Sequence, residues 1–143
     1  MKKVVFYFLS CFLFISCQEK QKPVTDKESS SFKMYEMTEM ASLMEQMYVD
    51  NQRIKQKIEN NESDFGEFPE YYLKIHSAEM TDPDDFDDFF KSEALKFEEF
   101  QKLVYTDTSD VKTNFNNMVN ACIECHQKKC TGPIERIKKL YIN

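Results

Sequence analysis

Glycine and proline are scarce in this chain and tryptophan is absent: the 143 residues include 2 Gly, 4 Pro and no Trp. So few breakers of secondary structure argue against all-β, repeat-blade and collagen-like folds, and they favour long helices. Neither glycine belongs to a phosphate-binding loop pattern, so nothing indicates a nucleotide site. With 2 His and no Ser/His/Asp or paired-carboxylate constellation, the chain is not expected to be an enzyme.

Apolar residues, in contrast, are plentiful. Hydrophobic side chains make up 41% of the chain, with 13 Phe, 7 Tyr and 8 Met, which is enough for the core of one small domain. The formal net charge is −6. A negative domain is poorly suited to a polyanion, so we expect no nucleic-acid partner.

Residues 1–16 have the pattern of a bacterial lipoprotein signal peptide. Two lysines precede an apolar run over residues 4–15, which is too short to span a bilayer comfortably. The run ends in the lipobox-like motif Phe-Ile-Ser-Cys17, so cleavage before Cys17 would free its thiol for lipid attachment. Acyl chains there would hold the protein on a membrane surface. An ordinary signal peptide cleaved nearby, or an uncleaved anchor, is the alternative.

The remaining chain divides into a tether and a domain. Residues 17–32 are polar, with one proline and a serine run, and we expect a flexible linker. Residues 33–143 would then form the folded domain. The location implied is the bacterial cell envelope, with the lipid anchor in the outer membrane and the domain facing the periplasm or the cell surface.

The folded part carries four amphipathic segments joined by short loops. Apolar residues recur every three or four positions in each, which predicts helices. Such segments bury their apolar stripes most simply in an all-α, antiparallel four-helix bundle, and a short amphipathic helix follows a Gly-Pro break at the C-terminus. The four predicted helices span residues 34–60, 69–80, 83–106 and 111–129.

The motif that carries chemistry is Cys122-Ile-Glu-Cys125-His126. This C-x-x-C-H pattern is the attachment signature of c-type haem. Two thiols about one helical turn apart can form thioethers with the two vinyl groups of one haem, and the adjacent imidazole then becomes the proximal iron ligand. The sequence therefore predicts one covalently bound haem c. Its attachment requires an exported chain, which agrees with the signal peptide.

Two other interpretations use the same cysteines. Cys122, Cys125 and Cys130 with a histidine could form a zinc site in a structural lipoprotein, although Cys125 and His126 are adjacent and bind one tetrahedral ion awkwardly. A redox-active C-x-x-C pair is less well supported, because no βαβ pattern surrounds it.

A bundle with its single C-x-x-C-H near the end of the last helix resembles the class II c-type cytochromes, the cytochrome c′ and cytochrome c-556 group. The specific part of the resemblance is the segment Asn-Met-Val-Asn-Ala-Cys-Ile-Glu-Cys-His over residues 117–126, together with the methionine-rich first helix. In class I cytochromes c the motif lies near the amino terminus, with a methionine ligand far downstream. Here only seventeen residues follow His126 and none is methionine.

The resemblance implies roles for individual residues. Cys122 and Cys125 would form the thioethers and His126 would bind iron on the proximal side. The first helix would cover the other haem face, with Met44 nearest the distal position and Met40 and Met47 one turn away on either side. From the sequence itself His76 is a further candidate distal ligand.

The group that occupies the distal position of the haem iron separates two possible functions. Methionine on iron would give a low-spin centre for single-electron transfer to redox partner proteins in the envelope. A vacant distal position would give a five-coordinate binder or sensor of nitric oxide or carbon monoxide. The resemblance is also compatible with a homodimer. The chain departs from the family at Cys130, where arginine is frequent, and in the extension over residues 131–143.

Overall fold

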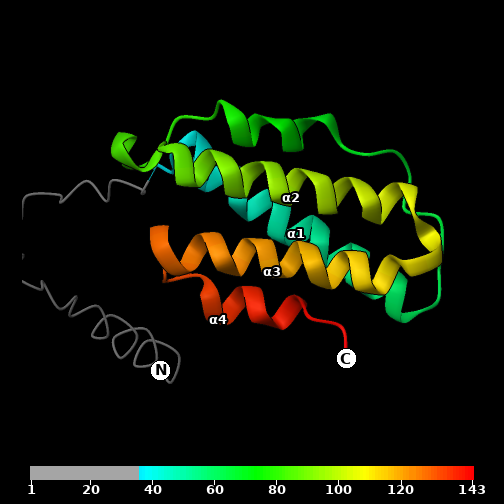
Figure 1. Ribbon diagram of the computed structural model, residues 1–143. Helices are drawn as coiled ribbons and strands as arrows, with labels where there is room; N and C mark the ends of the chain where they lie inside the picture. The colour runs from blue at the N-terminus through cyan, green and yellow to red at the C-terminus, as the bar shows by residue number, and fades with distance from the viewer. Residues whose placement is uncertain (1–35) are drawn as a thin grey trace, which may run out of the picture. The chain divides into compact units, whose positions relative to one another are not determined.

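The computed structural model describes residues 36–143, which are helical throughout with connecting turns and loops (Figure 1). The predicted signal peptide (1–16), the lipidated Cys17 and the linker (17–32) lie outside the described residues. Within residues 36–143 there is no strand, and no helix is long and apolar enough to cross a membrane. The prediction of an all-α domain is confirmed.

Three long helices form the frame of the domain. Successive helical segments run in alternating directions, and α2 and α3 make the most extensive pair (Figure 1). The residues buried on each helix recur every three or four positions, as the apolar stripes predict. The bounds of the three helices are α1 Glu39–Glu59, α2 Asp88–Thr106 and α3 Val111–Lys129.

The second predicted helix is wrong in type and length. A 3-10 helix, η2, covers Glu70–His76 where an α-helix over residues 69–80 was expected. Its two buried residues, Tyr72 and Ile75, are three positions apart, which matches the three-residue turn of a 3-10 helix. The apolar pattern of this segment is too short to bury a full α-helical face. It packs against α1 and α2.

The third predicted helix also begins later than expected. Asp82 and Pro83 start a separate 3-10 turn, η3 (Pro83–Asp85), and not α2. The side chain of Asp87 accepts a hydrogen bond of 2.8 Å from the backbone N–H of Phe90, and this cap sets the start of α2. A further 3-10 turn, η4 (Thr108–Asp110), joins α2 to α3.

The C-terminal extension folds back along α3. It contains α4 (Ile134–Ile137) and η5 (Lys138–Leu140), so the predicted short C-terminal helix is confirmed. Asn116 on α3 donates to the carbonyl of Ile142 (2.9 Å) and accepts from its N–H (3.0 Å). The ammonium of Lys55 on α1 donates to the carbonyls of Lys139 (2.9 Å) and Tyr141 (2.8 Å). These contacts fix the extension against two helices.

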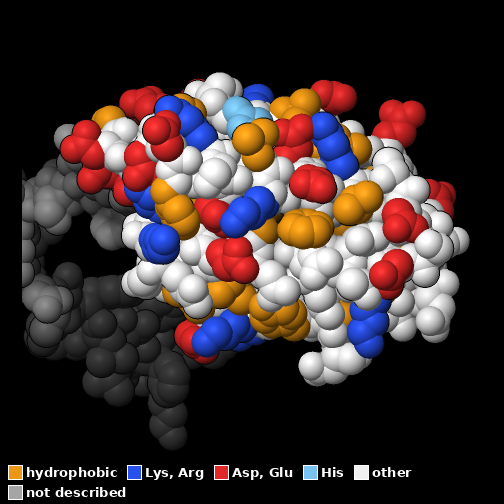
Figure 2. All heavy atoms as spheres, in the orientation of Figure 1, with side chains coloured by type: hydrophobic (Ala, Val, Ile, Leu, Met, Phe, Trp, Pro, Cys, Tyr) orange, Lys and Arg blue, Asp and Glu red, His pale blue; other side chains and the backbone are white. Residues whose placement is uncertain are grey.

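The surface carries both signs of charge. Acidic and basic side chains are interspersed over the face drawn in Figure 2, with hydrophobic groups between them. Several form exposed ion pairs within one helix turn, such as Lys91 with Asp88 and Lys138 with Glu135. Such pairs contribute little to stability.

Candidate functional site

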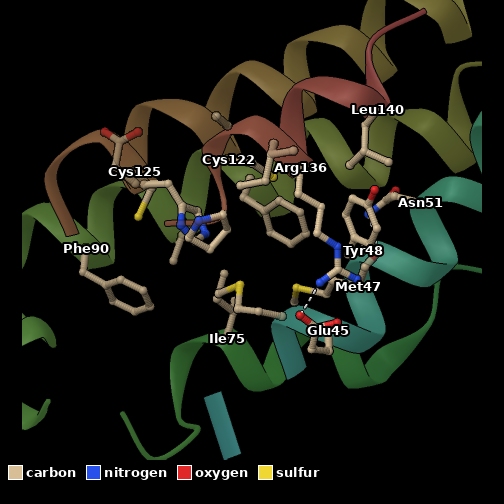
Figure 3. Close-up of a pocket in the computed structure, with 18 residues that line it drawn as sticks. Glu45, Met47, Tyr48, Asn51, Ile75, Phe90, Cys122, Cys125, Arg136 and Leu140 are labelled. Atoms are coloured by element: carbon tan, nitrogen blue, oxygen red, sulfur yellow. Dashed lines mark hydrogen bonds and ion pairs between the residues drawn. The ribbon is translucent and has the colours of Figure 1, made fainter. Parts of the chain in front are cut away.

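One apolar cavity lies between α1, α2, α3 and the C-terminal extension (Figure 3). The recess, counted out to open solvent, measures about 780 Å³. The lining combines small and large apolar side chains with a few polar ones. Lining residues on which the site depends are Met44, Met47, Glu93, Cys122, Cys125, His126 and Arg136.

The two motif cysteines line this cavity from α3. Cys122 and Cys125 are three residues apart, so one helical turn separates them and they share one face of the helix. The Sγ of Cys122 lies 3.7 Å from the sulfur of Met118, whose side chain is fully buried beneath it. Both thiols are half-buried and form no disulfide. The predicted attachment pair is therefore brought together at one cavity wall.

His126 lies at the same wall with one ring nitrogen already engaged. Its Nδ1 is 2.8 Å from the backbone carbonyl of Cys130. A carbonyl oxygen only accepts, so Nδ1 carries the proton and the lone pair of Nε2 is left free. A backbone hydrogen bond of this kind typically fixes the tautomer and orientation of a metal-binding imidazole. The side chain of Cys130 is exposed and its thiol is not part of the lining.

Burial keeps the two thiols protonated. It raises the pKa of Cys122 to about 12 and that of Cys125 to about 11, and the nearby carboxylate of Glu93 adds to the effect at Cys125. Reactive and zinc-binding cysteines normally lie in surroundings that lower their pKa. The surroundings of Cys122 and Cys125 are of the opposite kind.

The methionines of α1 divide into two groups. Met44 and Met47 line the cavity from α1, whereas Met40 is packed in the core away from the lining. The structure therefore joins two of the three methionine candidates to the cysteines and His126, and it leaves Met40 out.

His76 also lies away from the cavity. On η2 its Nε2 is 2.7 Å from a carboxylate oxygen of Glu98, and it is absent from the cavity lining. This position gives His76 no place as a distal ligand.

Two buried polar atoms at the cavity have no hydrogen-bond partner. They are the Oδ1 of Asn51 and one carboxylate oxygen, Oε2, of Glu93, whose other oxygen is 2.8 Å from Lys96. Buried polar atoms are normally paired, so unpaired ones at a recess indicate space for water or a ligand. Glu93 was not among the predicted site residues, although its spacing of three from Phe90 places it on the buried face of α2.

Arg136 is the second residue of the site that sequence reasoning missed. It extends from α4 over the cavity, pairs with Glu45 on α1 at 2.5 Å and stacks on the ring of Tyr48 at 3.9 Å (Figure 3). No spacing rule connects residue 136 to residue 45, because only the folded extension brings them together. The sequence feature that could have indicated this role is the position of Arg136 within the short amphipathic segment that follows the Gly-Pro break.

The residues fit a covalent haem better than a zinc ion. In residues 36–143 no three His, Cys, Asp or Glu side chains come together as a metal-binding group, which leaves the zinc interpretation without a ligand set in this part. Two thiols and one free imidazole nitrogen on one wall match the donors that haem attachment uses. The recess, counted out to open solvent, has the size of a small-molecule site.

Comparisons with known proteins add no family to this description. No protein-family model, no curated protein and no solved structure matches the chain. The assignment of a function therefore depends on the chemistry of the site itself.

Proposed function

We propose that this protein is a membrane-tethered c-type cytochrome that carries single electrons on one covalently attached haem. The observation on which this depends is the shared cavity. Both thiols of C-x-x-C-H and its histidine line it from α3, and Met44 and Met47 line it from α1. A chance C-x-x-C-H on a surface helix would not be expected to face a methionine-lined recess.

In this proposal each wall has a separate role. Cys122 and Cys125 hold the haem by thioether bonds, and His126 offers Nε2 to the iron. Met44 is the first candidate for the opposite ligand and Met47 the second. The bound haem supplies a one-electron iron centre; the chain fixes its ligands, excludes water and sets the surrounding charge.

The order of the helices also supports the proposal, with two differences from the class II cytochrome bundle. We propose that α1, η2, α2 and α3 correspond to the four members of a class II cytochrome bundle, with the second member shortened to a 3-10 helix. The C-terminal extension then adds a further wall to the haem site, which that family normally lacks.

The proposed setting is the bacterial cell envelope. Lipid on Cys17 would tether the domain through the linker, and the haem would exchange electrons with redox proteins there. Because the net charge is −6, a partner with a basic docking face would associate faster at low ionic strength.

A second candidate is a five-coordinate haem protein that binds nitric oxide or carbon monoxide. The lining outside α3 is largely apolar, with Met47, Ile75 and Phe90 among its residues, and would accept a small uncharged gas. The two candidates differ only in whether a methionine sulfur occupies the distal position.

A visible spectrum tests both. The full chain is expressed with c-type maturation factors, purified and reduced, and its spectrum is recorded with and without carbon monoxide. Electron transfer predicts a low-spin ferrous spectrum that carbon monoxide does not change. A high-spin spectrum that shifts with carbon monoxide supports gas binding, and zinc without haem absorbance supports the structural lipoprotein.

A further inference from the structure

Arg136 is the one cation of the C-terminal extension that lines the cavity. Apart from His126, the other lining residues that carry a charge are Glu45 and Glu93, both acids. An arginine at a mostly apolar recess is a strong recognition element for carboxylates, because its planar guanidinium can donate two parallel hydrogen bonds.

The fold holds this arginine in a defined position. α4 packs against α3, and the chain after it is fixed by Lys55 and Asn116. The next residue, Ile137, is buried, so the backbone under Arg136 is anchored on the core side. The guanidinium itself rests on the ring of Tyr48, a contact that orients its plane.

The present partner of Arg136 is exchangeable. The carboxylate of Glu45 is 2.5 Å away, but both side chains are more than 40% exposed, and exposed pairs of this kind are weak. A carboxylate arriving from the cavity could therefore replace Glu45 without leaving a buried charge unpaired.

The position of Arg136 also matches the shape of haem. The vinyl groups and the two propionates lie on opposite halves of the haem ring. When Cys122 and Cys125 hold the vinyl half, the propionate half must lie on the far side of the cavity. Figure 3 shows the Arg136 guanidinium beside Glu45 and Tyr48, with Cys125 on the other side of the view and Cys122 nearer to Arg136.

We infer that Arg136 binds a haem propionate and that Glu45 is the carboxylate it releases when haem is in place. This inference rests on the proposed function. It gives the C-terminal extension a purpose: the extension supplies the cation of the haem site from a segment that lies after the attachment motif.

Midpoint potentials of the haem-loaded full chain test the inference. Removal of a positive charge beside the haem favours the ferric state, so Arg136→Gln should lower the potential while Arg136→Lys lowers it less. Glu45→Gln should raise it. Lys138 and Glu135 form a matched control, because they are an exposed pair at 2.7 Å on the same segment and do not line the cavity.

The controls separate the outcomes. Lys138→Gln and Glu135→Gln should shift the potential far less than the corresponding changes at Arg136 and Glu45. Equal shifts in both pairs, with an unchanged haem spectrum, would overturn the inference and leave the cytochrome proposal standing. A wild-type protein without haem absorbance would overturn both. If Arg136→Gln fails to fold, Arg136→Lys decides the question, because it keeps the charge and loses the bidentate guanidinium contact, so an unchanged potential in that variant would overturn the inference.

Discussion

The same two helices, α2 and α3, pack completely at one end of the domain and incompletely at the other. At the loop that joins them, Val104 and Phe115 are fully buried, each with 0% of its surface exposed. Toward the C-terminus of α3, Cys122 and Cys125 are only half-buried and border the cavity. The polypeptide alone fills the first region and leaves the second unfilled.

The difference comes from side-chain size. Ala94 on α2 and Ala121 on α3 both line the cavity, and neither can fill the space that a phenylalanine or valine fills at the closed end. Interiors are normally close-packed, so an apolar recess bordered by small side chains is a candidate ligand site. The closed end, near the α2–α3 loop with Val104 and Phe115, therefore contributes mainly to stability. The open end, at the cavity with Cys122 and Cys125, contains the candidate site.

The largest expected effect is at the open end. His126→Ala removes the proximal ligand, and we expect the normal haem spectrum to be lost even where thioethers form. The chain provides a matched control in its other histidine: His76→Ala breaks the hydrogen bond to Glu98 outside the cavity and should leave the spectrum unchanged. An unaltered spectrum in His126→Ala would remove this residue from the site.

At the closed end the expected effect is on stability. Phe115→Ala deletes a fully buried ring and should lower the free energy of unfolding by about 3–5 kcal/mol, because a cavity forms where packing is complete. Urea denaturation measures the change. The position of the Soret band should not move; a shifted band would show that the two regions are not independent.

Met44, which lines the cavity, and Met40, which is buried in the core, test whether the site and the core can be changed separately. Met44→Ala should convert a low-spin spectrum to high-spin and cost less than about 2 kcal/mol, because the side chain borders a cavity. Met40→Ala should cost about 2–5 kcal/mol and leave the spectrum unchanged, because Met40 is buried in the core. If Met47→Ala changes the spin state and Met44→Ala does not, the distal ligand is Met47.

The smallest expected effect is a pH dependence of the haem-free protein. The folded-state pKa values of Cys122 and Cys125 are raised to about 12 and about 11, so the folded state keeps protons that the unfolded state loses. The contribution of the two thiols to stability should be constant below about pH 8.5 and fall above it, by at most about 1.4 kcal/mol per pH unit for each thiol. Urea denaturation at several pH values should show this slope. Between about pH 8.5 and pH 10 the slope should be smaller when both thiols are changed to alanine, because above that range the buried hydroxyls of Tyr71 and Tyr72, whose pKa values are also raised, add a slope of their own.

Much of the frame could be predicted from the sequence, because helix periodicity and end signals are local. The predicted span of α3, residues 111–129, matches the structure, and α1 begins five residues later than predicted. The α-helix predicted over residues 69–80 is instead the 3-10 helix η2. Its apolar pattern is too short to determine the helix type, so the type depends on packing against α1 and α2. The start of α2 was misjudged because two aspartates five residues apart, Asp82 and Asp87, both cap turns.

The site was predictable in part. The spacing of C-x-x-C-H placed Cys122, Cys125 and His126 together, and the stripe of α1 placed Met44 and Met47 on a buried or half-buried face. Arg136 and Glu93 were not predicted. A charged residue on a buried face goes against the hydrophobic pattern, and a contact between α4 and α1 depends on how the extension folds back.

The central claim is that haem is bound covalently by two neighbouring thiols. A pyridine haemochrome spectrum of the full chain, purified from a host with c-type maturation factors, tests it most directly, with Cys122→Ser/Cys125→Ser as the control. The account predicts the haemochrome of a haem with both vinyl groups saturated in the wild type and no covalently retained haem in the double variant. Colourless wild-type protein from that host would contradict it.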